Sequence, residues 1–456
     1  MSPSFAPSDP MSKPARPARL LLLFQGEWED HAVTEFRRTG ELALEREGFD
    51  VMHFPGCLRL LHFDARRFAD RMCETYRGRI DAVWSNDEQF GCLLAAVVAQ
   101  RLGLPGADPA AVARAQHKLL LRQTLAKALP HATVNATALP WSLSDRRVRR
   151  PEQLDRAVQE LGCRWPLFCK PIKGTFSVLA RKVRSAAELA AHLRLSWFDR
   201  FVLTRLALPY EQLASQLLDL PCPADRMLLE EPIDGQQVNV DGYAHGGEVH
   251  ILGVVDEWMY PGEVQGARHF SGFTYPSRQP ADVQQRLRET AAAAVRAVGF
   301  AHGVFNVELF VLADGSVRVI EINPRSAGQF ATMYRDVDGL DLERLGVQLA
   351  IGGDPRHVAR HEPRAGAAAS FVFRRFDGTP GPAPSAESLA WLAKTHPHAW
   401  LWLEPGSGRV LRREYRWLGS HRHAVLNHAA SDFESLVREG EECGRRLFGA
   451  AVLPRS

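Results

Sequence analysis

The sequence predicts a multidomain protein that combines an α/β domain with α+β domains. With 456 residues the chain is too long for one ordinary hydrophobic core, so about two to four domains are expected. Strand and helix patterns alternate over residues 19–110, which favours a parallel sheet covered by helices. Farther along, runs of alternating apolar residues flank glycine turns at 246–247 and 314–315, which predicts antiparallel hairpins.

The composition is typical of a soluble globular protein, with 45% apolar and 24% charged residues. Residues 1–18 are rich in Pro, Ser and Ala, and we expect a disordered tail there. The apolar run at 20–24 is too short for a signal-peptide core, and no run approaches membrane-spanning length. Seven cysteines without a Cys-x-x-Cys pair or Cys/His metal spacing favour reduced thiols in the cytoplasm. A net charge of +3 gives no reason to expect nucleic acid or an anionic membrane as a partner.

The alternating part is assigned to one N-terminal α/β domain. Its expected strands are 20–24, 50–54 and 81–85, and its expected helices are 31–47, 64–77 and 88–102. No Gly-x-Gly-x-x-Gly follows the first strand, which argues against a dinucleotide site. Residues 25–27 would form a loop at the carboxyl end of that strand, the edge where open α/β sheets bind ligands.

The next elements follow from capping and turn signals. A helix that begins at Asp108-Pro109 is expected over about 109–128, and a basic linker follows at 142–150. Other expected elements are strand 166–171, helix 185–195, strand 226–231, a hairpin of 238–244 with 249–255, helix 281–298, the hairpin at 303–323 and helix 340–351. A segment rich in Gly, Pro and Ala at 363–384 marks a boundary, and a final helix is expected over 432–447.

The hairpin at 303–323 carries the most informative side chains. With a two-residue turn at 314–315, Glu308 faces Glu321. Because side chains alternate with period two, Asn323 shares the face of these two glutamates. Facing carboxylates repel each other unless a cation lies between them, and Mg²⁺ prefers few carboxylates together with phosphate oxygens. The pattern therefore predicts a magnesium site, and a surface hairpin with a solvated polar face is the alternative.

The residues of this hairpin resemble the ATP-grasp superfamily, and in particular its carboxylate–amine ligases for amino acids. The resemblance lies in Val-Glu at 307–308 and Glu-Ile-Asn-Pro-Arg at 321–325. It implies that Glu308, Glu321 and Asn323 hold Mg²⁺ or Mn²⁺ together with ATP. It also implies that Arg325, which follows the strand, contacts an acyl phosphate.

The resemblance implies an ATP-grasp fold with four parts. A Rossmann-like pre-ATP-grasp domain would span 19–110, a lid region 111–235, and a core with the metal site 236–360. A small C-terminal subdomain would span 365–456. Specific motifs cover about 100–355, whereas the N-terminal domain matches the family by architecture only.

Two lysines match the phosphate-binding positions of the family. The chain has 7 lysines and 49 arginines, so a lysine at such a position is informative. Lys118 lies on the helix entering the lid, and Lys170 precedes a proline at a strand end, where a lysine acts as a point charge on phosphate. The loop at 172–177 would cover the phosphates with the hydroxyls of Thr175 and Ser177. That loop has one glycine where the family usually has several, a departure that leaves its closure geometry open.

The remaining implied site residues would hold the nucleotide base, the ribose and the substrates. Glu230, with backbone groups near Glu231 and Ile233, would bind the adenine edge. Gln237 stands where the family commonly has a ribose-binding glutamate, so it can bond a diol but carries no charge. His269 could orient substrate or metal-bound phosphate, or it could lie in a surface loop.

The implied activity is an ATP-dependent ligation. A carboxylate would be activated as an acyl phosphate and attacked by an amine, which releases ADP and phosphate and forms an amide or peptide bond. Carboxylation through carboxyphosphate, as in biotin-carboxylase-like members, and a non-catalytic ATP-binding regulator are the alternatives. The substrates are expected to be amino acids, but neither the carboxylate nor the amine can be identified from the sequence. The oligomeric state stays open, a homodimer included.

Overall fold

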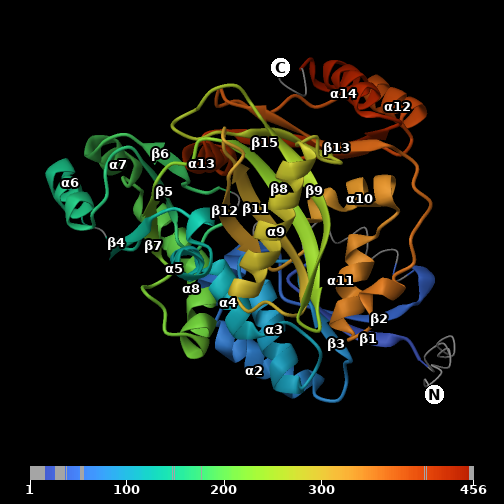
Figure 1. Cartoon of the computed structure of the whole chain (residues 1–456), viewed down its shortest axis with the longest axis horizontal. Coiled ribbons are helices and arrows are strands. Elements are labelled where there is room, and N and C mark those ends of the chain that lie inside the picture. The colour runs from blue at the N-terminus through green and yellow to red at the C-terminus, as the bar shows by residue number, and fades with distance from the viewer. Residues whose placement is uncertain are drawn as a thin grey trace.

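The computed structural model describes residues 16–25, 36, 38–51, 56–145, 147, 149–175, 177–404, 406 and 408–450. Within these residues the strands form three sheets, of three, four and eight strands. In Figure 1 the eight-stranded sheet fills the centre, the four-stranded sheet and its helices lie at the left, and the N-terminal helices lie at the bottom. This layered arrangement places two of the sheets beside the N-terminal domain.

The N-terminal domain is a parallel sheet with helices against it. Its strands are β1 (Ala18–Leu23), β2 (Leu42–Glu47) and β3 (Ala82–Trp84), in the order β2-β1-β3. A 3₁₀ helix (Gly56–His62) and α2 (Ala65–Tyr76) follow β2 in the chain. Helix α3 (Gly91–Leu102) follows β3. The predicted parallel α/β architecture is therefore confirmed.

The second strand is not where the sequence pattern placed it. Residues 42–47 form β2, so the helix expected over 31–47 is wrong there, whereas most of the strand expected over 50–54 lies outside the described residues. Leu, Ala, Glu and Arg favour helix, but residue-by-residue pairing with β1 overrides that propensity. Leu42 and Leu44 pack against the core while Ala43 between them is exposed, the alternation of an edge strand. Residues 1–15, 26–35, 37 and 52–55 lie outside the described residues.

The helix expected over 109–128 is two helices. Asp108 caps α4 (Pro109–Gln116) by accepting from the Ala110 N–H, as its Asp-Pro signal predicted. His117 then has an extended backbone, and α5 (Lys118–Ala128) begins after it. The His117 ring accepts from the Leu120 N–H at 3.2 Å, so the histidine caps the second helix. The break places Lys118 at the first position of α5.

The lid is an antiparallel sheet in the order β4-β7-β5-β6 with three helices. Its strands are β4 (Ala136–Ser142), β5 (Leu167–Pro171), β6 (Arg181–Val183) and β7 (Arg226–Glu230). Its helices are α6 (Pro151–Glu160), α7 (Ala186–His192) and α8 (Trp197–Leu217). Sequence reasoning missed β4, β6, α6 and α8. Pro209 lies inside α8 and the apolar residues surround that helix, which hid its period.

The core is one antiparallel sheet of eight strands, in the order β12-β11-β8-β9-β10-β13-β15-β14. Its first five strands are β8 (Gln236–His245), β9 (Glu248–Met259), β10 (Phe270–Tyr275), β11 (Gly303–Val311) and β12 (Val317–Asn323). The last three are β13 (Ala367–Arg375), β14 (Trp400–Leu403) and β15 (His421–Ala430). The strands after residue 365 thus continue the core sheet through the pairing of β10 with β13.

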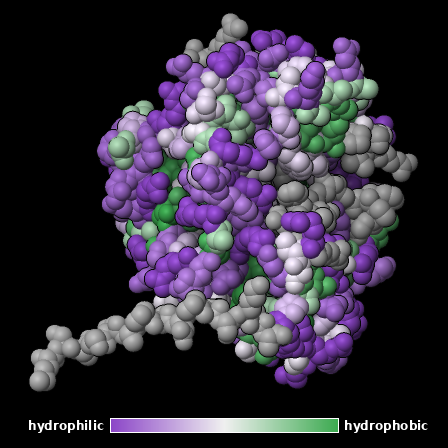
Figure 2. Space-filling model, turned by 90° about the vertical axis from the view of Figure 1, so that its right-hand side faces the viewer, coloured by the Kyte–Doolittle hydropathy of each residue, from purple (hydrophilic) through white to green (hydrophobic). Residues whose placement is uncertain are grey.

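Helices cover both faces of this sheet. They are α9 (Ala281–Ala297), α10 (Ala331–Asp338), α11 (Leu342–Ala350), α12 (Ala386–Thr395), α13 (Gly408–Leu418) and α14 (Phe433–Phe448), with 3₁₀ turns at Pro130–Ala132, Gly328–Phe330 and Pro355–His357. The face in Figure 2 is mainly hydrophilic, with hydrophobic residues in separate patches. Among the described helices, none combines the length and apolarity needed to cross a bilayer.

Candidate active site

The hairpin of β11 and β12 brings Glu308 opposite Glu321 and Asn306 opposite Asn323, as predicted. The turn itself differs from the prediction. Gly315 is the turn residue with positive φ, and the Gly315 N–H donates to the Leu312 carbonyl at 2.9 Å, which makes a three-residue loop. That loop shifts the pairing by one residue, and a β-bulge between Glu308 and Leu309 shifts it back. The two offsets cancel before the pairing reaches the glutamates.

The pKa values of the two glutamates are shifted in opposite directions. Burial, and next the Glu321 carboxylate, raise the pKa of Glu308 well above its ordinary value. Burial also works to raise the pKa of Glu321, but Lys118 and Lys170 outweigh it and lower that pKa to about 2. The Asn323 amide donates to Glu308 Oε1 at 3.3 Å. Two half-buried, facing carboxylates and an amide oxygen form a donor set that fits a hard divalent cation, because such a cation relieves their repulsion.

A polar row continues from this pair across the next strands. The Asn306 amide donates to Asn239 Oδ1 at 3.2 Å and to Asp241 Oδ1 at 3.0 Å, and the Tyr334 hydroxyl donates to Asp241 Oδ2 at 2.9 Å. The Asn239 amide donates to Glu257 Oε2 at 3.2 Å. Burial raises the pKa of Glu257 to about 8 and that of Asp241 to about 6. Asp241 and Glu257, two buried carboxylic acids with raised pKa values, therefore lie on the same face of the sheet as the Glu308–Glu321 pair.

Lys118 reaches the hairpin from the start of α5. Its Nζ lies 2.9 Å from Glu321 Oε2 and donates to the Gly174 carbonyl at 2.8 Å. Its backbone N–H donates to the Ile172 carbonyl at 3.4 Å. Lys118 thus connects the glutamate pair with the loop after β5. This position is consistent with the phosphate-binding role predicted for it.

Lys170 and Glu230 form a buried ion pair on adjacent lid strands. Lys170 Nζ lies 2.6 Å from Glu230 Oε1, and Arg122 Nε donates to Glu230 Oε2 at 3.0 Å. Each carboxylate oxygen of Glu230 is therefore already paired with a basic side chain, Lys170 or Arg122. The adenine-binding role expected for Glu230 stays a prediction. Glu231 is exposed and Ile233 half-buried, in the segment that leads from β7 to β8.

Gln237 and His269 lie in different surroundings. The Gln237 amide donates to Glu308 Oε2 at 3.1 Å, so Gln237 lies beside the Glu308–Glu321 pair.

His269 is buried rather than in a surface loop, and its Nδ1 lies 3.2 Å from Ser420 Oγ. Burial, and next the charge of Arg374, lower the pKa of His269 to about 4, so its ring is neutral. Among the residues that the structure describes, no hydrogen bond or ion pair joins His269 to the glutamate pair.

Arg325 lies just past β12 and pairs with the N-terminal domain. Its Nε donates to Glu88 Oε2 at 3.1 Å, and Nη2 makes a shorter contact with the same oxygen. The neighbouring Asn86 amide donates to Ser326 Oγ at 2.7 Å. These residues follow β3, so the carboxyl edge of the parallel sheet contributes to the site.

The loop after β5 is held by the same N-terminal segment. The Lys173 Nζ donates to the Glu88 carbonyl at 2.9 Å, and the Thr175 hydroxyl donates to Gln89 Oε1 at 3.2 Å. Burial lowers the pKa of Lys173 to about 8. Ser177 is exposed and has a positive φ of 55°. Lys173 therefore lies in the loop that Lys118 also contacts, through the Gly174 carbonyl.

Several residues of this site were missed from the sequence, namely Glu88, Asn86, Lys173, Arg122, Asn239, Asp241 and Glu257. Two signals were available for some of them. Glu88 follows a predicted parallel strand at the ligand-binding edge, and Arg122 lies four residues after Lys118 on one helix face. The polar row on β8 and β9 depends on cross-strand register, which the sequence pattern did not determine.

The comparisons with known proteins concern the domain family and the fold. The model of the ATP-grasp domain matches residues 163–333. Carnosine synthase 1 of Gallus gallus is 31% identical over 359 residues, which cover 76% of this chain and 36% of that protein. The chain therefore spans less than half the length of the carnosine synthases it matches.

Solved structures agree at the level of fold. The L-amino acid ligase from Bacillus licheniformis superposes with a TM-score of 0.68 at 16% identity, covering 97% of this chain and all of that one. N5-carboxyaminoimidazole ribonucleotide synthetase from Thermotoga maritima gives 0.61 at 14% identity, covering 94% and 99%. The predicted ATP-grasp fold is confirmed. The chain therefore contains an ATP-grasp domain, and it is similar in sequence to carnosine synthase and in fold to L-amino acid ligase.

Proposed function

We propose that the protein is an ATP-dependent carboxylate–amine ligase that joins amino-acid-like substrates through an acyl phosphate. One observation supports this most: two facing, half-buried glutamates lie beside Asn323 and within reach of Lys118, while Arg325 lies just past the end of the same strand. ATP-grasp membership implies use of ATP. The names of the relatives, carnosine synthase and L-amino acid ligase, favour amino acids as substrates.

In this proposal the acidic and basic groups have separate tasks. Glu308, Glu321 and Asn323 would hold Mg²⁺ or Mn²⁺, which would supply positive charge to screen the phosphates of ATP. Lys118 and Lys170 would bind phosphate oxygens and hold the γ-phosphoryl group toward the substrate carboxylate. No protein nucleophile is required, because the amine attacks the activated carboxylate directly.

Arg325 would act on the phosphoryl group as it moves. Its guanidinium now pairs with Glu88, a carboxylate that keeps it at the junction of the N-terminal domain and the hairpin. The planar fork of an arginine suits a phosphoryl group with developing charge. Glu88 would therefore act as a positioning residue for Arg325.

The substrates and the compartment are also proposals. Asn239, Asp241 and Glu257 continue the site along the sheet, and we assign this polar row to substrate recognition. The cysteines that the structure describes are free thiols, which supports a reducing, cytoplasmic location. No nucleic acid or membrane partner is proposed.

A substrate screen tests the proposal. The protein is incubated with ATP, Mg²⁺ and pairs of amino acids, and ADP release is measured beside product mass. We expect ADP release that needs both a carboxylate and an amine and that Glu321→Gln abolishes. Dependence on bicarbonate alone would instead indicate a carboxylase, and ATP binding without turnover by any pair would indicate a regulator.

A further inference from the structure

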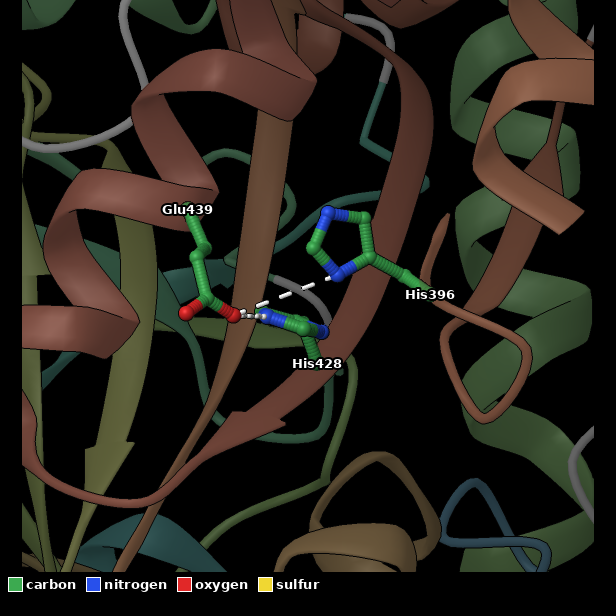
Figure 3. Close-up of side chains that lie close together, drawn as sticks. All are labelled: His396, His428 and Glu439. Carbon is green, nitrogen blue, oxygen red and sulfur yellow. Dashed lines mark hydrogen bonds and ion pairs between the residues drawn. The ribbon is translucent and has the colours of Figure 1, made fainter. Parts of the chain in front are cut away.

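Three side chains that could bind a metal meet in the C-terminal part of the chain, away from the glutamate pair. His396 ends α12, His428 lies on β15 and Glu439 lies on α14. Figure 3 shows the two imidazole rings and the carboxylate pointing toward one another. One ligand atom from each residue lies within 4.8 Å of the other two.

The individual distances are close to those of a metal site. His428 Nε2 lies 2.8 Å from Glu439 Oε2, and His396 Nδ1 lies 3.9 Å from the same oxygen. Ligand atoms that bind one tetrahedral zinc at about 2.0–2.1 Å lie about 3.4 Å apart. The observed separations lie on both sides of that value, so shifts on the order of 1 Å in these side chains would complete the geometry.

From this geometry we infer that His396, His428 and Glu439 form a binding site for a borderline divalent metal, with Zn²⁺ the best match. Two imidazoles and one carboxylate are a zinc donor set, whereas Mg²⁺ and Ca²⁺ prefer oxygen ligands alone. Three protein ligands leave a fourth position for water.

The surroundings favour a metal over a simple hydrogen-bonded trio. The side chains of His428 and His396 are 5% and 13% exposed, so both rings are largely shielded, while Glu439 at 29% leaves a route from solvent. Arg438 lies 3.6 Å from Glu439 Oε1, which leaves Oε2 to face the histidines. The two rings meet edge to face with centroids 4.7 Å apart, and only one of them hydrogen-bonds the carboxylate.

The site lies on the face of the sheet opposite the candidate active site. His428 pairs with Ala369, whose neighbour Ser370 accepts from Gln329 of the segment after Arg325. Because adjacent strand residues point to opposite faces, His428 and Ser370 lie on different sides. The metal would therefore connect α12, β15 and α14 and act on the stability of this part of the chain rather than on the reaction.

Cobalt and zinc titration of the whole protein tests this. Chelator-treated protein is titrated with Co²⁺ and then Zn²⁺ in excess Mg²⁺, which occupies oxygen-ligand sites. The absorption of bound Co²⁺ and the melting temperature with Zn²⁺ are recorded. Wild type is compared with His396→Gln, His428→Gln and the control His398→Gln, an exposed histidine two residues from His396.

We expect wild type and the control to bind one Co²⁺ that Zn²⁺ displaces, and Zn²⁺ to raise their melting temperature. Each site variant should bind at least about tenfold more weakly, since even the loss of an outer partner costs about that much. If wild type binds no better than a folded His396→Gln protein, the trio is a hydrogen-bonded structural cluster and the inference is wrong. His396 lies at a helix end, so its variant keeps the test open should His428→Gln fail to fold.

Discussion

At the scale of single residues, the site is a set of matched charges. Lys118 faces Glu321, Lys170 and Arg122 share Glu230, and Arg325 faces Glu88. Glu308 is the exception, because its nearest charged partner across the hairpin is another carboxylate. A cation bound between the two glutamates would remove this imbalance, so the residues that serve function also carry an electrostatic cost to folding.

Variants of the two glutamates should separate function from stability. Both Glu308→Gln and Glu321→Gln should abolish turnover and weaken Mg²⁺-dependent nucleotide binding. Without metal, however, Glu308→Gln should melt at a higher temperature than wild type, because it removes a half-buried carboxylate whose pKa is raised by its surroundings and by the facing Glu321. Turnover and thermal melts check this, with exposed Glu289→Gln as the control. Near wild-type turnover in a folded Glu321→Gln protein would rule out the metal assignment.

Arg325→Ala should nearly abolish product formation and leave ATP affinity within several-fold of wild type. The contact would matter most while the phosphoryl group transfers, and its loss should cost roughly 3–4 kcal/mol, or about 10²–10³-fold in rate. Arg325→Lys should restore the rate only in part, because it keeps the charge but not the planar fork. Equilibrium ATP binding is measured beside turnover. A collapse of both together would make Arg325 a ground-state anchor for the nucleotide.

Glu257 should make stability depend on pH. Its pKa is about 8 in the folded protein, above its ordinary value of 4.5, so between these values the folded state holds a proton that the unfolded state has lost. Stability should therefore fall as pH rises from about 5 to about 8, by roughly 4 kcal/mol, since each pH unit between the two pKa values corresponds to about 1.4 kcal/mol. Denaturant unfolding across this range should show a flatter profile for Glu257→Gln. Parallel profiles would mean that Glu257 is ionised in the fold.

At the scale of elements, a helix or strand was predicted correctly where local sequence signals determine its ends. Helices α2 and α9 have local caps or clear amphipathic periods and were predicted within a few residues. Strand β2 has the composition of a helix and is a strand because β1 pairs with it, a long-range cause that local patterns do not contain. The hairpin register came out right only because the bulge offsets the longer turn.

The break between α4 and α5 should control ATP affinity. His117 caps α5 through Leu120 N–H, and its other ring nitrogen lies 3.1 Å from the Cys222 carbonyl. His117→Ala should lower stability by about 1–2 kcal/mol and weaken ATP binding, because Lys118 loses its fixed position. His117→Asn supplies a good cap and should recover part of the affinity. Unchanged ATP binding in a destabilised His117→Ala protein would show that the break is structural only.

At the scale of the whole molecule, the three parts of the chain meet around the site. The N-terminal domain contributes Glu88, the lid contributes Lys170, and the core contributes the glutamate pair. The C-terminal strands continue the core sheet, and α13 contacts the lid where the Leu179 N–H donates to the Trp417 carbonyl at 3.1 Å. Sequence motifs singled out Lys170 and the glutamate pair as candidates, whereas contacts between distant segments, such as Arg325 with Glu88, needed the structure.

The central claim is that a substrate carboxylate is activated by phosphoryl transfer from ATP. Isotope transfer tests it most directly, using a substrate pair that supports turnover and a carboxylate labelled with ¹⁸O in both oxygens. Attack of the carboxylate on the γ-phosphorus places one of its oxygens in the acyl phosphate bridge, and amine attack then leaves that oxygen with phosphate. We predict that mass spectrometry will find one ¹⁸O atom in each phosphate released together with ADP. Unlabelled phosphate, or ¹⁸O found in AMP, would contradict the proposed reaction.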